Sequence, residues 1–281
     1  MGSSPPATIN LESYVSCRLY EDTRPHCLET AQLQKGLVLL VEGSEVIEEG
    51  MGFGAPVVLY QDRAFFSSSA DISVRREGNE MILTKSFTID AISRKRFGKD
   101  FYLNDSLYRF FQKRFHNIYT RNKDLAAVLT RFIELMKTFG VSTEFQKVSP
   151  KGIITVKYAI LPRLIEVEIV LSGLDKRGCS QVLILNEQGA SFFRKYSDTD
   201  GVTLIDGQIG AWEPTEAKEV SLSNLEETTG FSLRNNGGTR LFRGREKVRG
   251  RYSWVGFCYF LQPHTSRFRY SIRLTTAAMR D

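Results

Sequence analysis

Hydrophobic and polar residues alternate strictly along three segments in the second half of the chain. These segments are ITVKYAI (154–160), LIEVEIVL (164–171) and RFRYSIRL (267–274). Alternation with a period of two is typical of β-strands that bury one face. The polar face of each strand is therefore expected to be solvated or to line a groove, as antiparallel sheets allow.

Shorter segments rich in β-branched and aromatic residues predict further strands, with Gly, Asp and Asn turns between them. These predicted strands lie at 14–20, 37–42, 44–49, 57–60, 64–67, 81–89, 181–185, 191–196, 202–206, 217–222, 231–234 and 252–261. The spacing is typical of a β-sandwich. We therefore expect residues 1–281 to form one mainly-β domain, built as a large antiparallel β-sandwich.

The hydrophobic period becomes helical between residues 104 and 140. The segment opens with Asn104, Asp105 and Ser106, which suit a helix N-cap, and it closes at Gly140, which suits a helix end. We expect a two-helix hairpin inserted into the sandwich over 104–140. Residues 1–10 predict a disordered lead-in without the basic and apolar regions of a secretory signal.

Composition places the chain among ordinary globular proteins. It has 281 residues, of which 42% are hydrophobic and 25% charged, so it can bury a core without metals or disulfides. Its four cysteines show neither a CxxC pair nor zinc-ligand spacing, and its longest aliphatic run, 37–41, is too short to span a membrane. These features predict a cytoplasmic protein with no metal or cofactor.

The net charge of +6 is distributed unevenly. Residues 234–281 carry ten arginines and one lysine against Glu246 and Asp281, and residues 94–123 carry nine basic residues against two aspartates. The rest of the chain is acidic overall. This asymmetry predicts an anionic ligand or partner, and a basic solvated face without a ligand is the alternative.

Basic residues occupy every second position between residues 243 and 251. In an extended strand they would form a basic row on one face, whereas Gly244 and Gly250 also permit a loop or a turn. If 252–261 and 267–274 form a hairpin, basic rows from both arms converge. Arginine offers a planar fork for carboxylate, phosphate or sulfate. The candidate anion-binding residues are Arg243, Arg245, Arg251 and Arg269.

A glycine-rich segment, GMGFGA at residues 50–55, matches the GxGxxA dinucleotide-binding pattern. That pattern must open a helix, whereas Pro56 and a β-branched strand follow it here, so a dinucleotide site is excluded. A turn or close packing is one interpretation of the glycines. The other is a ligand-facing segment that includes Gly52, Phe53, Gly54 and Tyr60.

Four residues are candidate acid–base groups because they adjoin predicted strands near turns. Glycosidases pair two carboxyl groups at a set separation, which a sequence does not give. Trp212 and Trp254 are candidates for stacking on a sugar ring, although a core position is the alternative. The acid–base candidates are Glu187, Glu213, Asp62 and His264, and each also has the simpler interpretation of a surface or loop residue.

The number and order of these strands, with a helical insertion, resemble the galactose-mutarotase-like supersandwich and related carbohydrate-directed β-sandwiches. The paired histidines of the mutarotase site have no counterpart, since the three histidines fall on separate predicted elements. The resemblance implies a saccharide ligand, here an anionic one, and a metal-independent isomerase, lyase or hydrolase. The alternative is a non-enzymatic module that binds nucleic acid or an acidic polymer through the C-terminal arginines.

Overall fold

A computed structural model describes most of the chain. The described residues are 7–11, 14–26, 28–47, 50–60, 63–78, 80–97, 101–102, 141–210, 212–235, 239–248 and 251–276. The predicted helical hairpin at 104–140 lies outside these residues. Within them, the single helix is the short 3-10 helix η1 (Asp206–Ile209), and no helix is long and apolar enough to cross a membrane.

The described elements are overwhelmingly strands. In chain order they are β1 (Ala7–Asn10), β2 (Val15–Leu19), β3 (Arg24–His26), β4 (Leu28–Leu33), β5 (Val38–Val41), β6 (Ser44–Glu45), β7 (Gly52–Tyr60), β8 (Arg63–Glu77), β9 (Glu80–Phe97), β10 (Phe101–Tyr102), β11 (Val141–Lys147), β12 (Gly152–Leu161), β13 (Leu164–Leu174), β14 (Cys179–Gln188), β15 (Lys195–Asp198), β16 (Thr203–Ile205), β17 (Glu213–Thr215), β18 (Glu219–Ser223), β19 (Thr229–Arg234), β20 (Arg240–Val248), β21 (Arg251–Leu261) and β22 (Arg267–Thr276). The predicted mainly-β class is confirmed.

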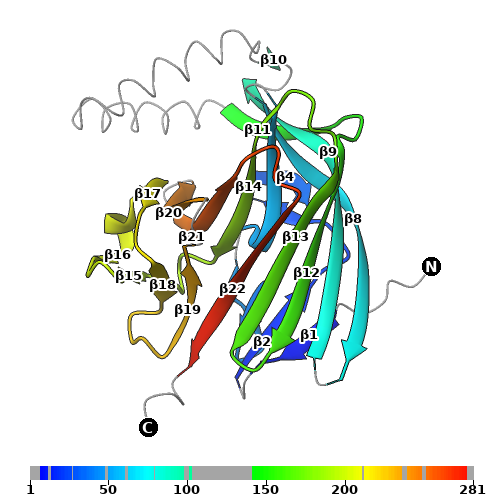
Figure 1. Cartoon of the computed structure of the whole chain (residues 1–281). Coiled ribbons are helices and arrows are strands. Elements are labelled where there is room, and N and C mark those ends of the chain that lie inside the picture. Colours follow the sequence, from blue (N-terminus) through cyan, green and yellow to red (C-terminus); the bar gives the residue numbers. More distant parts are fainter. Residues whose placement is uncertain are drawn as a thin grey trace.

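One large antiparallel sheet of 16 strands dominates the molecule. Its order is β16-β15-β18-β19-β22-β13-β12-β9-β8-β7-β14-β21-β20-β17, and β10 and β11 pair with β9. Figure 1 shows β22, β13, β12, β9 and β8 running side by side. A smaller sheet has the order β1-β2-β5-β6, and β3 pairs with β4.

Two parts of the large sheet pack face to face. The hydroxyl of Tyr158 on β12 donates to the carbonyl of Phe53 on β7, at 2.7 Å, and that of Tyr270 on β22 donates to Asn186 Oδ1 on β14, at 2.6 Å. Phe231 on β19 meets Phe53 edge-on, with ring centroids 4.9 Å apart. The layers that the sequence predicted as a sandwich are therefore parts of one continuous sheet.

The strict alternation of the sequence matches the burial of the strands. In β12 the buried residues are Ile154, Val156, Tyr158 and Ile160, and β13 and β22 alternate in the same way. Burial of these apolar faces is the main stabilising contribution that the pattern encodes. The opposite faces carry the polar residues, as expected.

The basic segment around residues 243–251 forms a hairpin. Residues 240–248 are strand β20, whose register with β21 places Gly244 opposite Gly256 and Val248 opposite Arg251. The hairpin proposed between 252–261 and 267–274 is wrong. β21 pairs with β14 and β20, whereas β22 pairs with β13 and β19, so β21 and β22 are not neighbours in the sheet.

The N-terminal segment is more ordered than the sequence suggested. Residues 7–10, which we assigned to the disordered lead-in, form β1 and pair with β2, and the side chain of Ile9 packs against the core. β1 is ordered because its backbone groups pair with β2, and one face of β2 is buried. Residues 1–6 lie outside the described residues.

Candidate ligand-binding groove and buried acid

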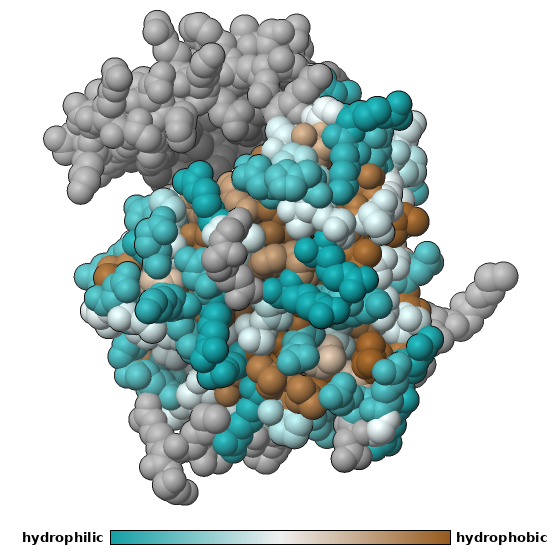
Figure 2. Space-filling model, viewed as in Figure 1, coloured by the Kyte–Doolittle hydropathy of each residue, from teal (hydrophilic) through white to brown (hydrophobic). Residues whose placement is uncertain are grey.

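A groove with a volume of about 1010 Å³ crosses the polar side of β8, β9, β12, β13 and β22 and reaches β19. Its lining combines charged side chains, hydroxyl groups and a few apolar residues. The lining residues are Ser73, Arg75, Glu77, Ile82, Thr84, Lys157, Ala159, Glu166, Val167, Glu168, Arg234, Arg269, Tyr270 and Ser271. Figure 2 shows hydrophilic residues gathered over the middle of the face that Figure 1 presents.

The register of the sheet arranges part of this lining as a row across five strands. Each residue of the row is the direct cross-strand partner of the next, so the side chains lie next to each other on one face. In sheet order the row is Ser73, Thr84, Lys157, Glu168 and Arg269. Hydroxyl groups thus occupy the β8–β9 end, and charges occupy the β12–β22 end.

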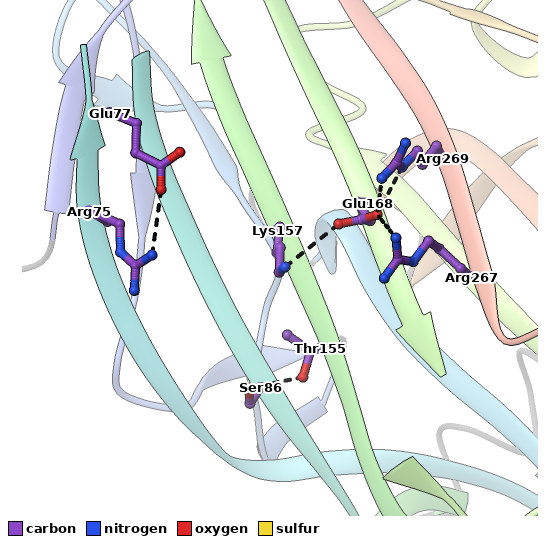
Figure 3. Close-up of polar contacts among 8 residues, drawn as sticks. All are labelled: Arg75, Glu77, Ser86, Thr155, Lys157, Glu168, Arg267 and Arg269. Atoms are coloured by element: carbon purple, nitrogen blue, oxygen red, sulfur yellow. Dashed lines mark hydrogen bonds and ion pairs between the residues drawn. The ribbon is translucent and has the colours of Figure 1, made fainter. Parts of the chain in front are cut away.

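Three cationic side chains surround the carboxylate of Glu168 (Figure 3). Arg269 donates to Glu168 Oε1 through Nε at 2.8 Å and through Nη2 at 2.6 Å. Arg267 Nη1 lies 3.3 Å from the same oxygen, and Lys157 Nζ lies 3.7 Å from Oε2. Charge-assisted contacts of this kind are stronger than neutral hydrogen bonds.

The pKa of Glu168 is held below its ordinary value by these neighbours. Desolvation raises the pKa of this carboxyl, but the hydrogen bond from Arg269 and the charges of Arg267, Arg269 and Lys157 together outweigh it. Glu168 is therefore ionised at neutral pH. Because three cations share this one carboxylate, the cluster keeps a net positive charge.

The cations of this cluster are accessible to a ligand. The side chains of Arg269, Arg267 and Lys157 are 68%, 57% and 47% exposed, whereas that of Glu168 is 17% exposed. The carboxylate thus lies beneath and between its partners. Its role is to hold the cationic heads together at one place on the sheet.

Hydroxyl groups and a second ion pair flank the cluster (Figure 3). Ser86 and Thr155 face each other across β9 and β12 with 3.1 Å between their oxygens. Towards the end of β8, Arg75 pairs with Glu77 at 3.5 Å, and both side chains are exposed. The groove and the sheet face beside it therefore carry a mixture of hydroxyl groups and charges.

Of the predicted anion-binding arginines, Arg269 lines the groove, whereas Arg243 and Arg245 lie on β20. Arg243 donates to the carbonyl of Ile209 and to Glu213 Oε2, at 2.9 Å for the latter. Six strands separate β22 from β21 in the sheet order. The basic rows on β20 and β22 therefore do not converge in the plane of the sheet.

Arg245 is buried rather than presented to solvent. Its Nη2 donates to the carbonyl of Ala190 at 2.6 Å, and its Nη1 lies 3.2 Å from Asp206 Oδ1. Asp206 also accepts both hydrogen bonds of the Arg194 fork, at 2.9 and 2.6 Å. These arginines are engaged in holding η1 and the neighbouring turn against the sheet.

Glu187 is a buried acid near the end of β14. It is 3% exposed, and its Oε2 accepts from the backbone N–H of Met51 at 2.9 Å. Desolvation raises its pKa to about 8. The Met51 hydrogen bond and Lys35 oppose this rise, and the charge of Glu246 adds to it. Glu187 is therefore largely protonated at neutral pH.

The two tryptophans lie on the same side of β20 and β21. Trp254 is 8% exposed and is the cross-strand partner of Glu246. The indole of Trp212 covers Gly244, where a Cβ would approach it to 2.6 Å, and its Nε1 donates to Glu246 Oε1 at 2.9 Å. Glu246, which the sequence did not single out, thus links Trp212 to the surroundings of Glu187.

The glycine-rich segment is explained by close packing. Gly52 and Gly54 have φ angles of +79° and +77°, which favour glycine. A Cβ on Gly54 would lie 2.8 Å from the hydroxyl of Tyr158, and one on Gly52 would lie 2.9 Å from the carbonyl of Leu37. Phe53 between them is fully buried.

Tyr60, Glu213 and His264 lie apart from the groove lining. Tyr60 donates to the carbonyl of Asp175, and Glu213, whose side chain is 58% exposed, pairs with Arg243. His264 is exposed in the connection between β21 and β22, and its carbonyl accepts from Lys176 Nζ at 3.3 Å. Asp62 lies outside the described residues. Arg251 is the first residue of β21, and its side chain lies outside the described part of the structure.

Sequence reasoning missed Lys157 and Glu168 as site residues. The signal was present, because the alternation in 154–160 and 164–171 places both on the polar face. Which strands would be neighbours was not encoded in any local pattern. The pairing of β12, β13 and β22 is what brings these residues to Arg267 and Arg269.

No family model matches the chain, and a search of curated proteins finds no match. Among solved structures it is similar to the ligand-free α-N-acetylgalactosaminidase NagBb from Bifidobacterium bifidum, at 9% identity and a TM-score of 0.50, over 98% of this chain and 36% of that one. A quadruple mutant of that enzyme matches at 11% identity with the same TM-score and coverage. The 4-α-glucanotransferase from Thermococcus litoralis matches at 6% identity and a TM-score of 0.39, over 96% and 37% of the chains.

The similarity to the Bifidobacterium enzyme concerns the fold alone at this level of identity. The present chain spans about a third of that enzyme's length, 36%. The chain is thus a mainly-β protein whose large antiparallel sheet has a counterpart within a carbohydrate-active enzyme.

Proposed function

We propose that the protein binds a saccharide in the groove across β8, β9, β12, β13 and β22. The observation that carries the proposal is the row of hydroxyl and charged side chains that cross-strand pairing places along a groove of about 1010 Å³. Sugars present many hydroxyl groups, which such a row can both donate to and accept from. The volume suits an oligosaccharide.

The fold similarity is consistent with this proposal but carries less weight than the groove. A shared fold hosts many functions, so a carbohydrate-active neighbour supports a saccharide ligand only by analogy. The resemblance to carbohydrate-directed sandwiches in the sequence points the same way. The anionic character of the ligand is a separate question that depends on the charges around Glu168.

Screening the full chain on a glycan array tests the proposal. We expect binding to a subset of oligosaccharides, confirmed by calorimetry in solution. Replacing Thr84 and Ser73 by alanine removes two hydroxyl groups from the row and is expected to weaken binding by about fivefold or more. The matched control is Ser180→Ala, because Ser180 is exposed and lies outside the groove lining. Absence of binding to every saccharide would overturn the proposal.

A second candidate function is acid–base catalysis on a sugar, and the environment of Glu187 is the observation that favours it. A carboxyl group that stays protonated near neutral pH is suited to act as a general acid. Glu187 lies on β14, which does not contribute to the groove. In this function the sugar would therefore have to reach Glu187 from the side of β14 and β21. If it operates, Glu187→Gln abolishes turnover, whereas Glu213→Gln tests the second carboxyl predicted from the sequence.

A further inference from the structure

The charges along the groove are paired one to one at its two ends but not in the middle. At its two ends each arginine has one carboxylate: Arg75 pairs with Glu77, and Arg234 pairs with Glu219 at 3.3 Å. Such exposed one-to-one pairs contribute little net charge. In the middle, Lys157 and Arg269 of the groove lining share Glu168 with Arg267, which adjoins the lining.

The central cluster remains positive when its next acidic neighbour is included. Glu166 lies two residues from Glu168 on the same polar face of β13, where it is exposed and opposite Ser271. Three cations therefore stand against two carboxylates. The exposed heads of Arg267 and Lys157 approach Glu168 at 3.3 and 3.7 Å, which leaves donors that can turn towards a ligand.

The neighbourhood of the cluster is neutral and hydroxylic. Ser86 and Thr155 lie on one side along the strands, and Ser73 and Thr84 continue the row towards β8. A polymer with a negative charge at every unit would place charges next to these hydroxyl groups and next to Glu77. A saccharide with an acidic group flanked by neutral units matches the pattern better.

We propose that the groove is specific for an acidic saccharide whose carboxylate or sulfate docks at Lys157, Arg267 and Arg269, with neutral sugar units extending over the hydroxyl row towards β8. The inference rests on the proposed saccharide binding and adds the class of ligand and the position of its charge. The two arginines provide planar forks suited to either anion. Glu168 competes with the ligand for these donors and sets the affinity.

The test compares neutral, uronate-containing and sulfated oligosaccharides of matched length, together with a short DNA duplex, against the full chain. Acidic saccharides are expected to bind about tenfold more tightly than neutral ones. The uronate and sulfated sets separate the two sources of the anionic group. Arg267→Ala combined with Arg269→Ala should remove this preference, so that the variant binds acidic and neutral saccharides equally.

Two further variants make the result decisive. Arg273→Ala is the matched control, because Arg273 is exposed on the same strand and the same face but lies opposite Leu164 rather than Glu168. We expect it to retain the full preference. Glu168→Gln removes the competing charge but keeps an amide oxygen that can accept from Arg269, so that Arg269 stays in place. This variant should bind acidic saccharides several-fold more tightly. Thermal melting of each variant establishes that the fold is retained.

The outcomes separate the two proposals. Equal binding of neutral and acidic saccharides overturns this inference and leaves saccharide binding in place, whereas no binding to any saccharide overturns both. A preference that survives the double arginine variant contradicts the assigned position. DNA binding that is tighter than any saccharide and falls steeply with salt would instead identify a polyanion-binding module.

Discussion

At the scale of single residues, Lys85 and Glu187 are two ionisable side chains that are buried in the protein. Lys85 on β9 is fully buried, and its Nζ donates to the carbonyls of Tyr20 and Lys35 at 2.7 and 2.8 Å. Desolvation lowers its pKa to about 7. Glu187, whose pKa is raised to about 8, is buried on β14. Burial disfavours the charged form of each, so their pKa values move in opposite directions.

Glu187→Gln is expected to change how stability depends on pH. The pKa of Glu187 is 4.5 without perturbation and about 8 in the folded protein, so the folded state binds more protons between these values. Stability therefore falls as pH rises through this window, and the full loss is present above pH 8. Glutamine can keep the acceptor for the N–H of Met51 without carrying a charge. The variant should be about 1–3 kcal/mol more stable than the wild type at pH 9.

Denaturant unfolding from pH 5 to pH 9 measures this effect. The difference in the free energy of unfolding between variant and wild type isolates the contribution of Glu187. Lys85 changes the stability in the opposite direction with pH, but it is common to both proteins. For Lys85 the folded pKa lies below the unfolded one, so its contribution rises with pH between about 7 and 10.5. Glu213→Gln serves as an exposed control. Parallel pH profiles for wild type and Glu187→Gln would contradict the assignment.

At the scale of elements, glycines allow the segment before β5 to lie against β7. Gly36 donates to the carbonyl of Met51 at 2.8 Å, and Leu37 and Phe53 exchange two backbone hydrogen bonds at 2.9 and 2.8 Å. This contact joins the chain leading into the small sheet to the large sheet. The glycine-rich sequence at 50–55 is thus explained by backbone approaching backbone.

Gly36→Ala is expected to destabilise the protein strongly. An added Cβ would lie 1.9 Å from the carbonyl oxygen of Phe53, and a backbone atom cannot move aside without breaking the contact between the two segments. We expect a loss of about 3 kcal/mol or more in the free energy of unfolding. Gly178→Ala is the control, because its φ is +73° but its Cβ would meet nothing within 4 Å. That variant should cost about 1 kcal/mol, and equal losses would refute the role of close approach.

At the scale of the whole molecule, hydrogen bonds and aromatic contacts hold distant strands of one sheet face to face. Asn186 Oδ1 accepts from the hydroxyl of Tyr270 and from the N–H of Gly54, at 2.6 and 3.2 Å. Tyr259 packs against Tyr270 with ring centroids 4.9 Å apart. Parts of the chain far apart in sequence therefore stabilise each other across the core.

Tyr270→Phe tests this cross-core connection. The variant keeps the ring packing and removes one donor to a buried amide oxygen, which retains the N–H of Gly54 as a partner. We expect a loss of about 1–2 kcal/mol in the free energy of unfolding, measured by denaturant titration. Tyr14→Phe, which removes a half-buried hydroxyl that donates to Thr228 at 3.2 Å, should cost less. A larger loss for Tyr14→Phe would show that the Asn186 contact is not a principal link.

The sequence by itself determined the class of fold and the polar face of each strand. Alternation requires only that neighbouring side chains point to opposite sides, so it correctly placed Lys157, Glu168 and Arg269 away from the core. It also marked the glycine-rich segment as a place of close approach or turning. The sequence did not determine whether the basic positions at 243–251 form a strand or a turn, because the residues are compatible with both.

Only the tertiary structure decided which polar faces became neighbours. Arg269 and Glu168 are 101 residues apart, and Met51 and Glu187 are 136 residues apart, so no local pattern predicts either contact. Strand order and register are fixed by the packing of the whole core, because the apolar face of each strand must be buried against residues distant in sequence. For that reason Arg243 and Arg245 on β20 pair with Glu213 and Asp206, whereas Arg269 on β22 lines a groove.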